Sequence, residues 1–294
     1  MEPRDYGPYP YVPINRRPKW KWPNGARLAI WVAPNLEFFP LTRPLAANPM
    51  AKTPEKAPTI RTWGVRDYGN RVGVFRMMDL LSKYGIRATA SLNADLCDQH
   101  PQIVEDALKL DWEFLAHNRT NAVWLSAIPH DEERDFIRYC IERVTRATGK
   151  RPTGWLSSAM DETWNTLDHL VAEKVRYVTD WVNDDQPYRM QAGGGEIVYL
   201  PYSYETNDNA QIVSRFASID DFERMIKRTF DVLYRESEDS ARVMAICLHP
   251  FISGVPHRIA GLDAAFRYIC DHNDVWWATG EEIVSAYLAS DAKI

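Results

Sequence analysis

The feature that most constrains the fold is an alternation of short apolar runs with amphipathic stretches, repeated from residue 26 to the end of the 294-residue chain. Apolar, β-prone runs such as 26–33 and 86–92 have the length of single strands. The stretches between them have helical spacing, as at 130–149. Such alternation is typical of parallel strands covered by helices, in a barrel or a doubly wound sheet. We therefore expect one α/β domain over residues 26–294.

Two segments stand outside this alternation. Residues 1–25 are rich in proline and aromatic residues, which predicts an extended N-terminal arm that wraps a surface or a neighbouring subunit. Residues 34–68 contain several prolines and no clear period. We expect so long an irregular segment to be functional or to contact another subunit.

The composition argues against several classes of protein. The net charge is −5, the pI is about 5.8 and the basic residues are scattered, so we expect no nucleic-acid partner. No apolar run has the length of a membrane span, and residues 1–25 lack the apolar region of a secretory signal. We therefore expect a cytoplasmic protein with no membrane partner. The four cysteines lie far apart without CxxC spacing, which predicts free thiols.

Polar residues gather where the predicted strands end. In a βα barrel the catalytic residues lie at the carboxyl ends of the strands. The chain has only seven histidines, and two of them fall at such ends, which favours a shared site. The residues at these positions are Asn35, Glu37, His117, Asp180, Asn207, Asp208 and His249.

Four of these residues are catalytic candidates. His249 is predicted to be a general acid or base, because an imidazole titrates near neutral pH. Asp180 is predicted to orient His249 through a ring N–H, as the third member of a triad does. His117 is predicted to hold a substrate carbonyl or to act as a second acid or base. Glu37 is predicted to activate a water, with apolar neighbours that raise its pKa. For each residue a structural role is the alternative.

Further residues are candidates for substrate binding. Asparagine amides donate hydrogen bonds to a developing oxyanion, and aromatic side chains form a wall for a ring. The alternatives are that Arg71 forms a surface pair with Asp67 and that the tryptophans pack in the core. The substrate-binding candidates are Asn35, Tyr68, Arg71, Arg119, Asn121, Trp155, Trp181 and Asn207.

Five motifs follow one another along the chain: "DYGNRVGVFRMMDLL" (67–81), "RPTGW" (151–155), "YVTDW" (177–181), "LPYSYETND" (200–208) and "AICLHPFISGVPHR" (245–258). In this order they resemble the NodB-like polysaccharide deacetylase superfamily. More narrowly, the chain is similar to the cytosolic branch of metal-independent allantoinases and cyclic-imide hydrolases, whose hallmark segment resembles the first motif. The resemblance implies a distorted (β/α) barrel of the NodB type, hydrolysis of a C–N amide bond in a small molecule, and a homo-oligomer, either a dimer or a tetramer.

The chain also departs from the family pattern. The deacetylases have an Asp-Asp pair after the first strand, where this chain has Asn35 and Glu37. Their two histidines four residues apart become His117 and Asn121. Asparagine is a poor transition-metal ligand, so we predict catalysis without a metal cofactor. The alternative is that Glu37, His117 and a further oxygen hold one divalent ion such as zinc. The loop 156–162 lacks the arginine of that branch, which favours a substrate other than allantoin.

The sequence thus predicts a hydrolase in which water attacks the carbonyl of an amide, a ureide, a cyclic imide or an N-acyl compound. Glu37 or His117 takes the proton of the water, and the sequence does not choose between them. His249 protonates the departing nitrogen. The alternatives are a metal-dependent amide hydrolase or deacetylase of the same fold, and a non-catalytic protein that binds a small molecule on a degenerate deacetylase scaffold.

Overall fold

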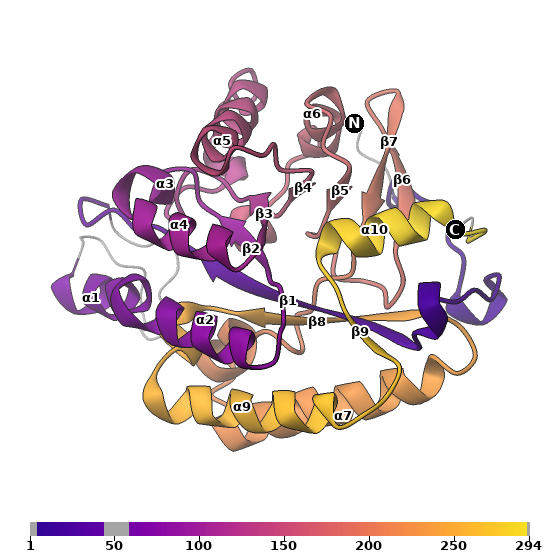
Figure 1. The fold of residues 1–294 in the computed structure, drawn as a ribbon. Coiled ribbons are helices and arrows are strands. Elements are labelled where there is room, and N and C mark those ends of the chain that lie inside the picture. Colours follow the sequence, from indigo (N-terminus) through magenta and orange to yellow (C-terminus); the bar gives the residue numbers. More distant parts are fainter. Residues whose placement is uncertain (1–4, 44–58, 293–294) are drawn as a thin grey trace.

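The computed structural model describes residues 5–43 and 59–292. Their strands form one curled, nine-stranded sheet (Figure 1) in the order β6-β7-β5-β4-β3-β2-β1-β8, with β9 paired to β1. Every pairing is parallel except that of β6 with β7. The strands are β1 (Leu28–Leu36), β2 (Thr89–Leu92), β3 (Glu113–Ala116), β4 (Gly154–Trp155), β5 (Tyr177–Val178), β6 (Tyr188–Ala192), β7 (Gly195–Tyr199), β8 (Arg242–Leu248) and β9 (Val275–Trp277).

Helices cover the outer face of the sheet. Helices α7 and α9 run along β8 and β1 at the bottom of Figure 1, and α2, α4 and α5 lie over the strands that follow β1. The helices are α1 (Ile60–Tyr68), α2 (Val74–Lys83), α3 (Leu96–Gln99), α4 (Pro101–Lys109), α5 (Glu133–Thr148), α6 (Thr166–Ala172), α7 (Ile219–Glu236), α8 (Pro250–Ser253), α9 (Pro256–Cys270) and α10 (Gly280–Ala289). The mostly parallel, curled sheet confirms the predicted distorted (β/α) barrel.

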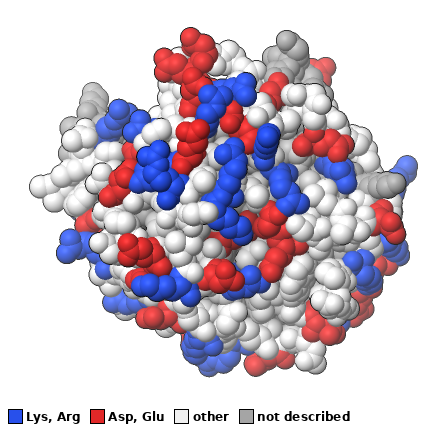
Figure 2. All heavy atoms as spheres, turned by 45° about the horizontal axis from the view of Figure 1, so that its top comes forward, with Lys and Arg blue, Asp and Glu red and all other residues white. Residues whose placement is uncertain are grey.

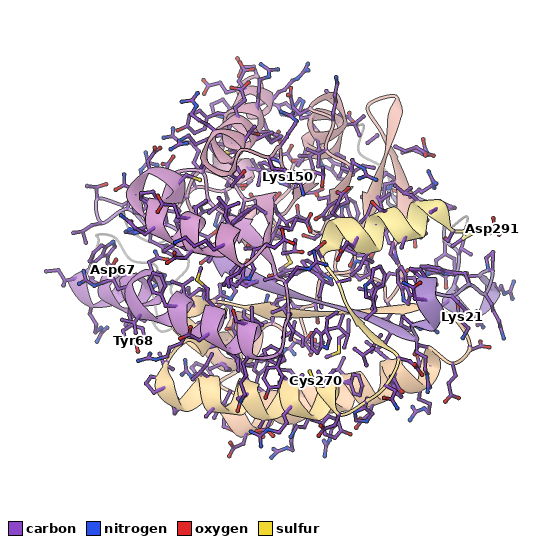
Figure 3. All side chains as sticks on the ribbon, in the orientation of Figure 1. Lys21, Asp67, Tyr68, Lys150, Cys270 and Asp291 are labelled. Atoms are coloured by element: carbon purple, nitrogen blue, oxygen red, sulfur yellow. The ribbon has the colours of Figure 1, made fainter. Side chains whose placement is uncertain are left out.

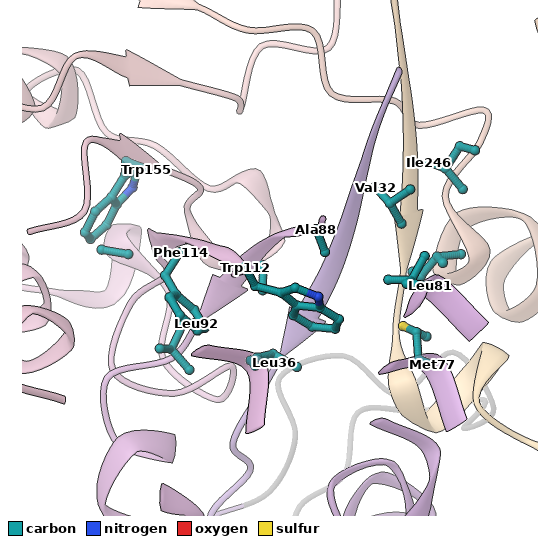
Figure 4. Close-up of a cluster of buried hydrophobic side chains, with 14 of the residues drawn as sticks. Val32, Leu36, Met77, Leu81, Ala88, Leu92, Trp112, Phe114, Trp155 and Ile246 are labelled. Atoms are coloured by element: carbon teal, nitrogen blue, oxygen red, sulfur yellow. The ribbon is translucent and has the colours of Figure 1, made fainter. Parts of the chain in front are cut away.

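Strand β1 is the centre of the molecule because all nine of its residues are buried. Its first part pairs with β8 and β9, whereas its last two residues, Asn35 and Leu36, pair with β2. Ile30 and Val32 face the helices, and Trp31 faces the interior of the barrel. Figure 4 shows part of the outer layer, with Val32 beside Ile246 of β8. A strand buried on both faces reads as a continuous apolar run, which is why the sequence predicts β1.

The amino-terminal edge of the sheet is closed by α10. The backbone N–H of Gly280 donates to the Thr89 hydroxyl at 2.8 Å, and that of Glu281 donates to the Glu113 carboxylate at 3.0 Å. Tyr177 also donates to Glu113, at 2.5 Å. A carboxylate at a helix N-terminus is favoured by the helix dipole. Helix α10 therefore fills this edge of the sheet.

The region after β1 is more regular than the sequence suggests. Strand β1 continues to Leu36, and α1 already begins at Ile60. A π-helical turn, Gly69–Gly73, joins α1 to α2, so that one helical stretch runs over 60–83. Residues 44–58, the middle of the segment predicted to be irregular, lie outside the described residues.

The arm lies along the barrel of its own chain. The backbone N–H of Gln191 in β6 donates to the carbonyl of Pro8 at 2.9 Å. Arg17 forms a buried ion pair with Asp184, and Trp20 is buried with only 7% of its surface exposed. All four cysteines are free, as predicted. None of the helices in the described part of the chain is long and apolar enough to cross a membrane.

Charged side chains of both signs are interspersed on the face shown in Figure 2. Exposed ion pairs of the described residues include Lys109 with Asp106 at 2.7 Å and Arg189 with Glu196 at 2.8 Å. Pairs of this exposed kind contribute little to stability.

Candidate active site

Three polar side chains converge where β1, β3 and β8 end. Glu37 follows β1, His117 follows β3 and His249 follows β8. The carboxylate oxygen Oε1 of Glu37 lies 3.7 Å from Nε2 of His117 and 3.6 Å from Nε2 of His249. Asn121 donates to the same oxygen from Nδ2 at 2.6 Å. One buried carboxylate therefore lies between two buried imidazoles, and this arrangement joins residues that are far apart in the sequence.

The backbone around Glu37 is fixed by side-chain amides. Asn70, in the π-helical turn, donates to the carbonyl of Glu37 at 2.9 Å. Asn93 accepts from the N–H of Phe38 at 2.8 Å and donates to the carbonyl of His117. The N–H of Asn121 donates to the carbonyl of Phe38 at 3.1 Å. The loops after β1, β2 and β3 are thus joined, which holds Glu37 opposite His117.

The contacts of His117 determine its tautomer. Its Nδ1 lies 2.6 Å from the carbonyl oxygen of Leu156, and a carbonyl only accepts hydrogen bonds. Nδ1 therefore carries a hydrogen. Nε2 is buried, has no hydrogen-bond partner among the described residues, and faces Glu37. In the neutral ring this nitrogen presents its lone pair to the cavity.

His249 is held by Asp208, not by Asp180, so the predicted pairing of Asp180 with His249 is wrong. Asp208 accepts from Nδ1 of His249 at 2.6 Å and from the His249 backbone N–H at 2.8 Å. It also accepts from the Ser253 hydroxyl at 2.6 Å. A bridge between Asn207 and Cys247 brings the chain after β7 alongside β8, and this places Asp208 next to His249.

The buried charges of the site stabilise one another. Burial alone would lower the pKa of His249, but the charges of Asp208 and Glu37 outweigh it and raise this pKa to about 10. Burial alone would raise the pKa of Glu37, but the imidazoles of His249 and His117 lower it to about 2. The prediction that apolar neighbours raise the pKa of Glu37 is therefore wrong, because the two imidazoles have the larger effect. At neutral pH the site holds an imidazolium at His249 and a carboxylate at Glu37.

These residues border a cavity of about 220 Å³. Its wall contains predicted residues, Asn35, Glu37, His117, Asn121, Asn207 and His249. Three buried acceptor atoms here have no donor among the described residues: Oε2 of Glu37, Oδ1 of Asn121 and Nε2 of His117. Buried acceptors without donors are unfavourable, so the cavity suits a ligand or water that brings N–H or O–H groups.

The amide of Asn35 is engaged within the protein. It accepts from Ser91 at 2.6 Å and donates to the carbonyl of Leu248 at 3.1 Å. Its amide N–H also donates to the hydroxyl of Tyr202 at 3.2 Å. Asn35 therefore forms part of the cavity wall and ties β1 to β2 and β8.

Several predicted substrate contacts lie outside the cavity. The side chain of Arg71 is 75% exposed and lies 4.0 Å from Asp67, the surface pair considered as the alternative. Figure 3 shows Asp67 and Tyr68 on α1 at the edge of the molecule. Tyr68 accepts from Arg76 at 2.5 Å.

The other three predicted substrate-binding residues also lie outside the wall of the cavity. Arg119 forms an ion pair with Asp95 outside the cavity. Trp155 is fully buried in the core, as its alternative proposed. Trp181 packs edge-on against Tyr9 of the arm.

The sequence analysis missed two features of the site. Asp208 was noted at a strand end but given no role. Arg66, which borders the cavity, lies over the rings of Phe39 and Phe251, at 4.9 and 5.5 Å from their centroids. No local signal in the sequence distinguishes Arg66, which borders the cavity, from Arg71, which is exposed.

The donor set does not fit a transition-metal centre. Catalytic zinc usually has three His or carboxylate ligands. Beside the two imidazoles, the third group at the Glu37 carboxylate is the neutral Asn121, whose N–H is turned to the carboxylate. The imidazolium of His249 also repels a cation from Glu37. Within residues 5–43 and 59–292, no three His, Cys, Asp or Glu side chains form a group that could hold a metal ion.

Comparison with known proteins finds a family match over part of the chain. The sequence profile of the family described as "Polysaccharide deacetylase" matches residues 64–178. A Schizosaccharomyces pombe protein named "Putative polysaccharide deacetylase" is 25% identical, with 94% of each chain covered. The peptidoglycan deacetylase of Helicobacter pylori is 22% identical over 75% of this chain and 85% of its own.

Solved structures share the fold. PuuE allantoinase matches over 100% of both chains with a TM-score of 0.85 at 24% identity. A CE4 family pseudoenzyme from Bacillus anthracis matches 87% of this chain and 65% of its own, with a TM-score of 0.53 at 11% identity. At such identities the likeness to solved structures establishes the architecture alone. The family profile over residues 64–178 supports the resemblance to the deacetylase superfamily that the motifs indicated.

Proposed function

Because the chain carries a polysaccharide deacetylase domain at residues 64–178, we propose that it hydrolyses the C–N bond of a small amide, ureide, cyclic imide or N-acyl compound. The observation that carries this proposal is the Glu37 carboxylate between the Nε2 atoms of His117 and His249. Two imidazoles in one small cavity supply the two proton transfers that amide hydrolysis needs.

His249 is the general acid of the proposed mechanism. It carries a proton at neutral pH because Asp208 and Glu37 raise its pKa to about 10 despite its burial. Its Nδ1–H is held by Asp208, so the proton on Nε2 faces the cavity. From there it passes to the departing nitrogen, and the positive ring stabilises the tetrahedral oxyanion before transfer.

His117 is the general base. Its Nδ1–H is held by the Leu156 carbonyl, so Nε2 presents a lone pair that takes a proton from the attacking water. Glu37, whose pKa is lowered to about 2, is too weak a base for this step. Its charge instead keeps His249 protonated, and its free oxygen Oε2 accepts from a substrate N–H or from the water.

We further propose that the reaction needs no metal ion. In support, the second histidine position of the deacetylases is occupied by Asn121, whose neutral amide binds transition metals poorly. The amide N–H of Asn121 faces the carboxylate, where a metal would require an oxygen or nitrogen lone pair.

The test is a hydrolysis screen of the purified chain against hydantoins, ureides, cyclic imides and N-acetylglucosamine oligomers, with and without chelator. The expected result is turnover that resists chelation and is lost in His249→Gln, whereas Arg71→Ala retains it. Turnover that chelation abolishes would overturn metal independence and favour the metal-dependent hydrolase. Tight binding of a compound without turnover would instead favour the binding protein.

A further inference from the structure

Two carboxyl groups near His117 are not used by the mechanism: that of Asp180, which is buried, and that of Glu162, which is partly exposed but has its oxygen Oε1 buried. Oδ1 of Asp180 accepts from the backbone N–H of Ser157 at 2.8 Å. The other oxygen of Asp180, Oδ2, is buried and has no donor among residues 5–43 and 59–292. The same holds for Oε1 of Glu162, and the two side chains are hydrogen-bonding neighbours.

Two buried acceptors that face each other need a proton between them. We propose that Glu162 keeps its proton, donates it to Asp180, and with Asp180 positions the imidazole of His117. Glu162 is thus a positioning residue, because it acts on the site only through its neighbours.

The connection to His117 runs through one peptide group. The N–H of the Leu156–Ser157 peptide donates to Asp180, and the C=O of the same peptide accepts from Nδ1 of His117 at 2.6 Å. A negative charge at the N–H end polarises the peptide and strengthens its carbonyl as an acceptor. The Nδ1–H tautomer of His117 is thereby favoured, and Nε2 is left to accept a proton. This last step rests on the proposed role of His117 as the base.

The surroundings of the pair favour a single negative charge. Burial, then the charge of Asp180, raises the pKa of Glu162 well above its ordinary value. Burial raises the pKa of Asp180 as well, against the hydrogen bonds from Ser157 and Glu162. The other groups that face the pair are Glu133 and the indole of Trp181, near Glu162, and His117, near Asp180. Because Glu133 is itself a buried acid, it disfavours a second charge at Glu162.

The test uses nuclear magnetic resonance of the full chain, which requires no substrate. Carboxyl-¹³C glutamate labelling reports the ionisation of Glu162, with the resonance assigned by its loss in Glu162→Gln. Long-range ¹H–¹⁵N correlation of the histidine rings reports the tautomer of His117. The matched control is Glu113→Gln, which alters another buried acid, bonded to Tyr177 at the opposite end of the barrel.

We expect the Glu162 carboxyl to be protonated at pH 7. Glu162→Gln, whose amide N–H still donates to Asp180, retains the Nδ1–H tautomer of His117, and so does the control. Glu162→Ala removes the donor that holds Oδ2 of Asp180, so the carboxylate is no longer fixed against the Ser157 N–H, and the Nε2–H tautomer of His117 then becomes detectable. A Glu162 carboxyl already ionised at pH 7, or an unchanged His117 tautomer in Glu162→Ala, would overturn the inference.

Kinetics on a substrate found in the screen give an independent measure. We expect Glu162→Ala to lower kcat about tenfold with little change in KM, a typical loss for impaired base catalysis, whereas Glu162→Gln stays close to wild type. Equal losses in the two variants would contradict the inference. Turnover by a protein whose Glu162 is ionised would refute the shared proton of Glu162 and Asp180 but not the proposed function. A protonated Glu162 without turnover on any compound would refute the proposed function but not the shared proton.

Discussion

Asp208→Asn tests the electrostatics of the site most directly. The Asp208 side chain is fully buried and accepts three hydrogen bonds, two from His249 and one from Ser253. Asparagine has nearly the same shape but no charge, and one of its two terminal atoms is a donor. The variant therefore removes the counter-ion of His249 and leaves at least one buried donor without an acceptor.

The pKa of His249 determines how much Asp208→Asn lowers the free energy of unfolding and how this loss depends on pH. A rise from its ordinary 6.5 to about 10 corresponds to about 5 kcal/mol at 1.36 kcal/mol per pH unit. This stabilisation is fully present below pH 6.5 and is lost as the pH rises through about 10, because the folded state binds the proton more tightly. Since Glu37 shares the effect, we expect Asp208→Asn to cost about 3–5 kcal/mol at pH 6 and about 2 kcal/mol less at pH 9.5.

Urea unfolding at pH 6 and pH 9.5, followed by the fluorescence of the 11 tryptophans, measures both free energies. The matched control is Ser253→Ala, which removes an uncharged donor to the same carboxylate. It should cost about 1 kcal/mol equally at both pH values. If Asp208→Asn costs the same at pH 6 and pH 9.5, His249 is not a cation paired with Asp208, and its assignment as the general acid fails.

Three further outcomes are expected. Gly73→Ala should destabilise the protein by about 1–3 kcal/mol in thermal unfolding, because the new Cβ would lie 2.1 Å from the Pro250 carbonyl oxygen. Its control, Gly64→Ala in α1, should stabilise the protein by about 0.5–1 kcal/mol, because its Cβ meets nothing within 4 Å. In wild type, stability should fall by up to about 3 kcal/mol between pH 4.5 and pH 2, because the pKa of Glu37 is lowered to about 2; urea unfolding of Glu37→Gln at pH 5 and pH 3 should lack this part. Arg119→Ala should leave turnover unchanged and shift stability by less than about 0.5 kcal/mol, since its ion pair with Asp95 lies outside the cavity; a clear loss of turnover would show that it contacts substrate.

The sequence predicted what depends on local pattern. The apolar run of β1 and the isolated histidines after β3 and β8 were enough to place Glu37, His117 and His249 at one edge of a parallel sheet. It did not predict which aspartate supports His249, since Asp180 and Asp208 both follow strands. That choice depends on the curl of the sheet, which returns the chain after β7 to the side of β8. The approach of these two segments arises from tertiary packing, and the hydrophobic periodicity of neither segment predicts it.

The two imidazoles differ in what holds Nδ1, and this difference assigns their roles. At His249 the acceptor is the Asp208 carboxylate, whose charge favours the imidazolium and thus a proton donor at Nε2. At His117 the acceptor is the Leu156 carbonyl, which fixes the same tautomer without a full charge and leaves Nε2 as a proton acceptor. Glu37 lies 3.6 and 3.7 Å from the two Nε2 atoms, and its charge stabilises the proton of His249. The Glu37 carboxylate therefore lies next to Nε2 of both rings. The proposed acid and base differ because Nδ1 of His249 donates to a carboxylate, whereas Nδ1 of His117 donates to a carbonyl.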